Sequence, residues 1–224
     1  MMLQDFFKAA GSDLLFRSRE KGQKDAALPV SVTDRVTKEQ GPFHAVTTRF
    51  SFAGGKGERT VVTDGEHVAF LTDRFLFGEP RCLYTSFDLP AGDGFFCNVA
   101  DKNRLVFRDR ATGIKFFRLL SATDNEDALE KNGLLMPDRR LLPGAIRVTA
   151  YAGLYRFGLE QTDHYIFVHA PENEIRAWHI KTNDGYEVSD PNKVCRFRIR
   201  ADRGAVTLSI PDGESIAVSL SPLK

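Results

Sequence analysis

Residues 194–220 alternate between apolar and polar side chains with a period of two. Cys195, Phe197 and Ile199 are separated by arginines, and after a turn at residues 202–204 the same alternation resumes twice before the segment ends. A period of two is typical of strands that bury one face. The segment therefore predicts a three-stranded antiparallel meander with one apolar face and one polar face.

Short alternating segments fill most of the remaining chain, over residues 28–120 and 145–193. Asp64-Gly65 lies between two of them and favours a two-residue hairpin turn, because glycine tolerates positive φ. The glycine cluster at residues 54–57 lacks the spacing of a phosphate-binding loop, and no helical pattern follows it. We therefore expect a hairpin turn there rather than a nucleotide site.

Two segments have helical spacing. Residues 1–19 carry apolar side chains at intervals of three and four, and residues 123–131 begin with capping residues and precede Gly133. The sequence thus predicts a mainly β protein, an antiparallel sandwich or barrel of short strands and hairpins, with an N-terminal helix and a short central helix. Three regions follow in chain order: 1–120 with the helix and a first β half, 121–144 as a helical excursion or linker, and 145–224 as a second β half. The halves form two domains or one continuous domain.

Composition limits the partners that we expect. The 224 residues include 18 Phe, are 42% hydrophobic and carry a formal net charge of +1, so no overall charge favours nucleic acid or anionic membrane. Three widely spaced cysteines, Cys82, Cys97 and Cys195, indicate inert thiols rather than disulfides. We find neither a secretory signal nor a membrane-length apolar run, so we expect a soluble cytoplasmic protein.

A histidine-rich stretch offers candidate chemistry at His164, His169 and His179, with Glu174 nearby. If residues 164–169 and 174–179 formed a hairpin, His169, Glu174 and His179 would suit acid–base catalysis, and the three histidines a metal. However, His164 and His169 differ in parity and face opposite sides of a regular strand. Ordinary rim histidines are the favoured interpretation, so we predict no metal site and identify no cofactor.

Arginines offer a second possibility. Arg196, Arg198 and Arg200 share one strand face, and residues 104, 108 and 110 carry a second set of arginines. Such sets suit the phosphates of single-stranded nucleic acid. The aromatic rings nearby fall mostly at the opposite parity, and acids such as Glu187 on neighbouring strands would neutralise the arginines. We therefore favour a solvated outer face.

One resemblance concerns two C-terminal strings, WHIKTNDGYEV and LSIPDGESIAV. They resemble the cupin type of small β-barrel, in which an IPxG turn precedes a strand with a metal-binding histidine. Here Glu214 and Ser215 follow the turn, and no histidine stands there. The ligand that the resemblance implies is therefore missing from this sequence.

These observations favour a non-catalytic β-rich binding or assembly module that binds another protein through loops on a rigid sheet framework. One alternative is a β-barrel enzyme, metal-dependent or carboxylate-based. The other is a single-stranded nucleic-acid binder that uses the arginine-lined strands. Active sites assemble from distant residues, so the lack of a catalytic motif leaves both alternatives open.

Overall fold

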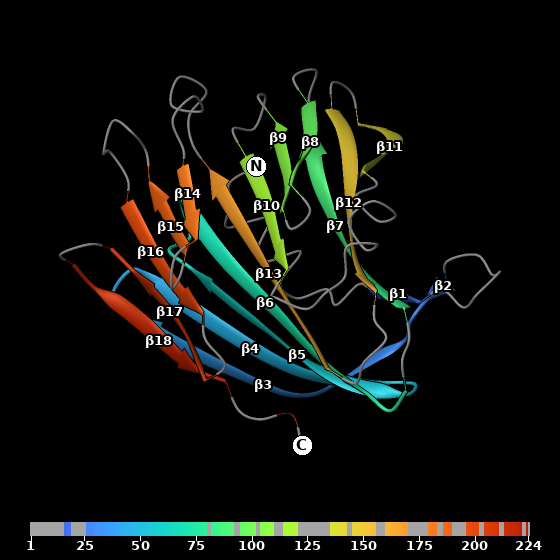
Figure 1. Cartoon of the computed structure of the whole chain (residues 1–224), viewed down its shortest axis with the longest axis horizontal. Helices are drawn as coiled ribbons and strands as arrows, with labels where there is room; N and C mark the ends of the chain where they lie inside the picture. The colour runs from blue at the N-terminus through green and yellow to red at the C-terminus, as the bar shows by residue number, and fades with distance from the viewer. Residues whose placement is uncertain are drawn as a thin grey trace.

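The described part of the chain consists of β-strands in three antiparallel sheets (Figure 1). No described residue lies in a helix, and nothing in this part could cross a membrane as a helix. The computed structural model describes residues 16–18, 26–79, 82–91, 95–101, 104–109, 114–120, 135–142, 145–155, 160–169, 179–182, 186–189, 196–201, 204–210, 213–220 and 223.

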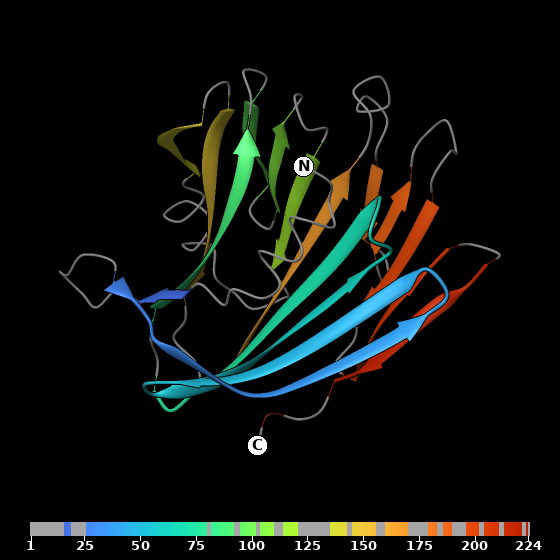
Figure 2. The ribbon, with the colours of Figure 1, turned by 180° about the vertical axis from the view of Figure 1, so that it is seen from behind.

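The largest sheet has eight strands and is strongly curved (Figure 2). Its strands, in spatial order, are β3 (Val30–Gln40), β4 (Phe43–Phe52), β5 (Gly55–Thr63), β6 (Val68–Phe77), β13 (Glu160–His169), β10 (Ile114–Leu120), β9 (Arg104–Asp109) and β8 (Phe95–Asp101). Because β13 lies between β6 and β10, strands from both sides of residues 121–144 share this sheet.

The C-terminal sheet confirms the predicted meander. It contains β14 (His179–Thr182), β15 (Tyr186–Ser189), β16 (Arg196–Ala201), β17 (Ala205–Ser209) and β18 (Ser215–Ser219), paired in chain order. On β16, Phe197 and Ile199 are buried whereas Arg198 and Arg200 are exposed. The alternation along the sequence thus gives the correct buried face.

The third sheet contains β11 (Leu135–Leu142), β12 (Ala145–Tyr155), β7 (Cys82–Ala91), β1 (Phe16–Ser18) and β2 (Ala26–Ala27). The expected N-terminal helix is wrong at its end, because residues 16–18 pair with β7 and β2 as a strand. Its first fifteen residues and the expected helix at 123–131 lie outside the described residues. Part of the expected excursion, Leu135–Leu142, is a strand paired with β12.

The eight-stranded sheet and the C-terminal sheet pack face to face around one apolar cluster. The described strands form open sheets rather than a closed barrel. The cluster joins β4, β5, β6 and β13 to β16, β17 and β18 through Phe43, Ala45, Val62, Val68, Phe70, Ile166, Val168, Phe197, Ile199, Val206, Leu208 and Ile216, with Leu220. A second, all-phenylalanine cluster forms on the other face at Phe50, Phe52, Phe75 and Phe77.

Both predicted hairpins on β5 are present. Ala53-Gly54 turns the chain between β4 and β5, with Gly54 at φ 82°, which confirms a hairpin at the glycine cluster. The loop between β5 and β6 has four residues rather than two, because the Asp64 carboxylate organises it. Asp64 Oδ1 accepts hydrogen bonds from the backbone N–H groups of residues 66, 67 and 68.

Candidate functional site

A row of buried polar side chains crosses the eight-stranded sheet on the face toward the C-terminal sheet. Thr47, Thr60, Thr72 and His164 occupy paired positions on β4, β5, β6 and β13. The Oγ1 atoms of Thr47 and Thr60 are 3.1 Å apart, and Thr72 Oγ1 is 3.0 Å from His164 Nδ1. Cross-strand partners therefore satisfy these groups inside the protein.

His164 is held as a neutral imidazole. Its ring stacks on Phe70 with centroids 5.4 Å apart, and the side chain is 7% exposed. Burial lowers the pKa of His164 to about 4, because removal from water disfavours the charged form. At neutral pH His164 therefore carries no charge, and one of its ring nitrogens already has a partner in Thr72.

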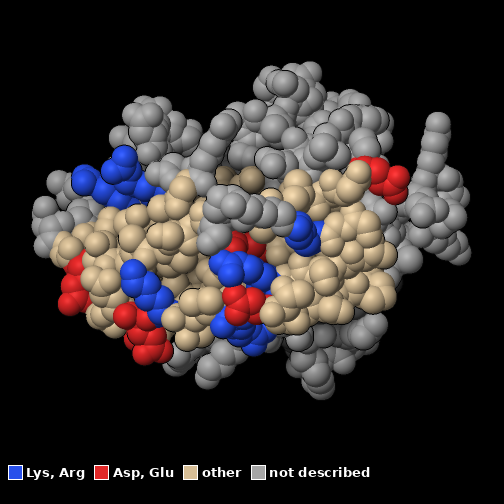
Figure 3. Space-filling model, turned by 90° about the horizontal axis from the view of Figure 1, so that it is seen from below, with Lys and Arg blue, Asp and Glu red and all other residues tan. Residues whose placement is uncertain are grey.

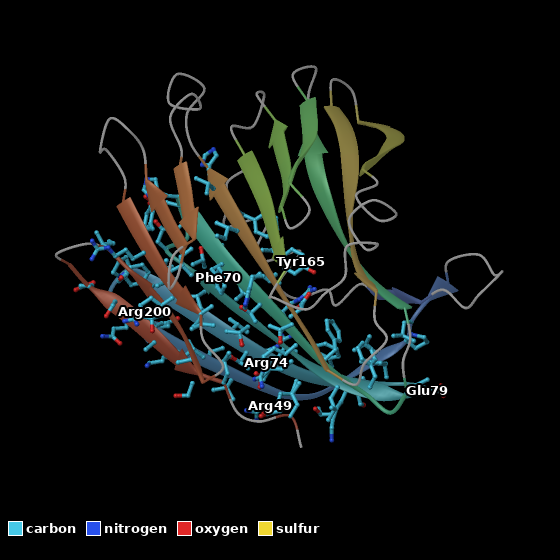
Figure 4. The ribbon with its side chains drawn as sticks, viewed as in Figure 1. Arg49, Phe70, Arg74, Glu79, Tyr165 and Arg200 are labelled. Atoms are coloured by element: carbon cyan, nitrogen blue, oxygen red, sulfur yellow. The ribbon has the colours of Figure 1, made fainter. Side chains whose placement is uncertain are left out.

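The next row along the strands is a ladder of alternating charges, Asp34, Arg49, Glu58 and Arg74, on β3, β4, β5 and β6. Arg49 donates to Asp34 at 2.9 Å and to Glu58 at 3.0 Å, and Arg74 donates to Glu58 at 2.9 Å. Figure 3 shows basic and acidic side chains alternating in the middle of the lower face, and Figure 4 shows Arg49 and Arg74 there, on β4 and β6, which lie on either side of β5. The Glu58 side chain is 1% exposed, so the ladder ties the outer strand to a buried carboxylate.

The opposite face of the same sheet carries a fully buried ion pair between Arg59 and Asp73. Arg59 Nε donates to Asp73 Oδ1 at 2.6 Å and Arg59 Nη2 donates to Oδ2 at 2.7 Å. This two-point geometry is the one that best offsets the cost of burying both charges. Together the two faces place charge and hydroxyl groups at one level along β5 and β6.

The outer edge of this sheet is the candidate site, because it presents backbone groups that no described strand pairs. Every residue of β3 after Val30 is exposed, and β3 pairs only with β4. Figure 2 shows β3 along the lower rim of the curved sheet. Val32 and Val36 are each 52% exposed. A free edge of this kind can accept another strand through main-chain hydrogen bonds.

Local geometry fixes which backbone groups point outward. Gly41, at φ 56°, and Pro42 form the two-residue loop between β3 and β4, in the order expected of a type II′ turn. The flanking pair, Gln40 and Phe43, is then a hydrogen-bonded pair. Because pairing alternates along an antiparallel ladder, even-numbered residues from 34 to 40 bond to β4 and the odd-numbered ones direct their N–H and C=O groups outward.

Two features limit and anchor this edge. The register shifts between Val32 and Asp34, so the regular part of β3 is residues 34–40, here called the β3 edge. Lys38 Nζ donates to the carbonyl oxygen of Ala217 on β18 at 2.6 Å, which joins the edge to the C-terminal sheet. Arg35 and Glu39 lie on the other face from Lys38, as their parity requires.

The histidines expected to converge lie in different places. The hairpin that would join them is not formed, because β13 pairs with β6 and β10 whereas β14 pairs with β15. His169 ends β13 on the face opposite His164, His179 begins β14 in the other sheet, and Glu174 lies outside the described residues. Within the described residues, no three His, Cys, Asp or Glu side chains are grouped to hold a metal ion.

The arginine sets also lie in separate sheets. Arg196, Arg198 and Arg200 are on β16, and Arg198 is directly opposite Glu187 on β15. Residues 104 and 108 are on β9 in the eight-stranded sheet, and residue 110 lies outside the described residues. Of the turn that resembles the cupin motif, the described residues show Gly213 N–H donating to the Ile210 carbonyl at 3.1 Å.

Comparisons with known proteins give a likeness of fold alone. No family model and no curated protein match the sequence. A solved heparinase III gene product with methylated lysines has a TM-score of 0.50 and 10% identity, over 87% of this chain and 30% of that one. Another heparinase III matches with a TM-score of 0.49 and 13% identity, over 92% and 29%. A heparan sulfate lyase HepC mutant from Pedobacter heparinus has a TM-score of 0.47 and 15% identity, over 85% and 28%. The chain therefore spans less than a third of each of these proteins.

Proposed function

We propose that this protein is a non-catalytic binding or assembly module that binds a strand of protein along the β3 edge. The observation that carries the proposal is an exposed outer strand whose odd-numbered backbone groups point away from the sheet. An added strand would gain main-chain hydrogen bonds there, and the exposed Val36 would contact one of its side chains.

The sheet behind β3 supports this role because it holds the edge in place before a partner arrives. Asp34 bonds to Arg49, Arg49 bonds to the buried Glu58, and Lys38 bonds to Ala217. A binding surface that is already ordered loses less conformational entropy on association. The ladder thus serves the edge strand instead of presenting charges to a substrate.

The likeness of fold is compatible with a module that works beside other protein. The matched heparinase III gene product is more than three times as long as the part that this chain covers. A similar fold thus occurs as one part of a larger chain. The name of that protein assigns no substrate to this one, since the likeness is of fold alone.

Selection of peptides on the full chain tests the proposal. We expect a displayed library of short, extended peptides to yield binders that lose at least about tenfold in affinity for Thr37→Pro and little for Thr37→Ala. Proline at position 37 removes an outward N–H, whereas β4 loses no hydrogen bond, so the fold tolerates it. Far-ultraviolet circular dichroism confirms that both variants are folded.

Two other ligand classes serve as controls, a nucleic acid for the binder that the sequence left open and the polysaccharide that appears in the name of a structural neighbour. Titrations with a single-stranded oligonucleotide and with heparan sulfate, each at two salt concentrations, measure binding that depends on charge. Tight, salt-sensitive binding of either ligand, unchanged in Thr37→Pro, would contradict the proposal. Peptides whose affinity is unchanged by Thr37→Pro would also contradict it.

A further inference from the structure

The outward-pointing groups of the β3 edge restrict how a second antiparallel strand can pair with it. Residues 35, 37 and 39 share one parity, and only these residues can exchange hydrogen bonds with a neighbour. When the neighbour is the same strand of another copy, each pair must join two odd-numbered residues. The two residue numbers of every pair then add to an even number.

This restriction matters because of the charges on the edge. Asp34 and Glu39 are acidic, and Arg35 and Lys38 are basic. The symmetric register midway between Val36 and Thr37 would place Arg35 opposite Lys38 and would repel. That register is excluded, because it would pair odd-numbered residues with even-numbered ones. The permitted registers centred on residue 36 or 37 instead place opposite charges against each other.

The register centred on Thr37 fits best. It places Arg35 of each copy opposite Glu39 of the other and pairs the whole regular segment, residues 34–40, with itself. Glu39 Oε1 lies 3.3 Å from His44 Nδ1, but the Glu39 side chain is 77% exposed, so it is accessible to a second copy. The register centred on Val36 relies on Asp34 and Lys38 instead, and it pairs only residues 34–38 of the regular segment with themselves.

Accordingly, we propose that the partner of the β3 edge is a second copy of this chain, paired antiparallel about Thr37 with two Arg35–Glu39 ion pairs. The inference rests on the proposed function and names the occupant of the same edge. Exposed charges commonly prevent edge strands from pairing with arbitrary strands. Here the charges of Arg35 and Glu39 repel strands with a different charge pattern, but they complement the same strand of a second copy. The register shift near Val32 ends the pairing and keeps the dimer small.

Reversal of one charge at a time gives a test that does not depend on destabilising the fold. Arg35→Glu and Glu39→Arg each place like charges at both symmetric contacts, so self-association measured by sedimentation velocity should weaken about tenfold or more. An equimolar mixture of the two variants places opposite charges at both contacts. That mixture, and the double variant alone, should associate within about threefold of the unchanged protein.

The full chain is measured from micromolar to millimolar concentration, because a single pair of short strands forms a weak interface. Single variants that associate like the unchanged protein, or a mixture that fails to associate, would overturn the inference. An unchanged protein that stays monomeric throughout would overturn it as well. In that case, peptide binding that still depends on Thr37 would leave the proposed function standing. Peptides insensitive to Thr37→Pro would remove the proposed function whatever the association state.

Discussion

Replacement of His164 by Asn should remove a large part of the loss of stability in acid. In the folded protein the imidazole is buried against Phe70, and burial lowers its pKa to about 4. In the unfolded chain it recovers the ordinary histidine value of about 6.5. The unfolded state therefore binds a proton more readily, and stability falls as the pH drops from about 6.5 through about 4.

The size of the effect follows from these two pKa values. His164 contributes almost nothing to the pH dependence above pH ~7.5, and it destabilises the protein by about 2 kcal/mol at pH ~5 and about 3 kcal/mol at pH ~4. Asn places its side-chain oxygen near the position of Nδ1 and can still bond to Thr72. It loses the stacking on Phe70, which costs a similar amount at every pH.

Urea unfolding, followed by far-ultraviolet circular dichroism between pH ~7.5 and pH ~4.5, measures this difference. The free energies of unfolding of the two proteins should converge as the pH falls. Both proteins also lose stability in acid through carboxylates such as Asp64, and this shared loss cancels in the comparison. Burial raises the pKa of Asp64, but hydrogen bonds from His67 and from backbone N–H groups lower it overall. Parallel pH curves for the two proteins would refute a buried neutral imidazole.

Three further changes test the packing of the eight-stranded sheet, each by urea unfolding at neutral pH. Asp73→Asn should destabilise the protein by about 3 to 5 kcal/mol, since Arg59 would be left buried and charged, whereas replacement of both residues by leucine should cost much less. Glu58→Gln should cost about 1 to 3 kcal/mol and speed amide exchange in β3 more than in β13, because the ladder loses its buried charge. Gly57→Ala should cost about 1 to 3 kcal/mol, because the new Cβ would lie 2.5 Å from Phe50 Cζ, and Phe50→Leu should relieve part of that cost.

The sequence predicts the elements whose two faces differ in polarity. Phe197 and Ile199 alternate with arginines, so both the strand and its buried face follow from the sequence alone. The sequence places β3 within the expected strands, but it does not give the strand a buried face, because Val32 and Val36 share their parity with Asp34 and Lys38. Gly41-Pro42 after a run of β-branched residues is the signal that would have indicated a hairpin there.

Long-range contacts depend on loop lengths that the sequence gives only approximately. A two-residue turn at Asp64-Gly65 would have placed Arg59 opposite Phe70. The Asp64 carboxylate holds a four-residue loop instead, which shifts the register and brings Asp73 opposite Arg59. The buried ion pair therefore could not be predicted from residue spacing alone. The expected convergence of the histidines is wrong for a related reason, because the order of strands in the sheets decides which strands are neighbours.

The polar rows on the two faces of the eight-stranded sheet fall at the same level of β6, from Thr72 to Arg74. Apolar side chains along a strand tolerate a slip of two residues in register, because one buried methyl group can replace another on the same face. The charged groups tolerate no slip in register. A slip would bury Asp73, Arg59 and Glu58 without their partners. We infer that these charged pairs on β3 to β6 fix the register in which the four strands are paired. An exposed edge that pairs with a second strand needs that constraint, because a β3 free to slide would exchange Arg35 and Glu39 for residues that do not complement a second copy.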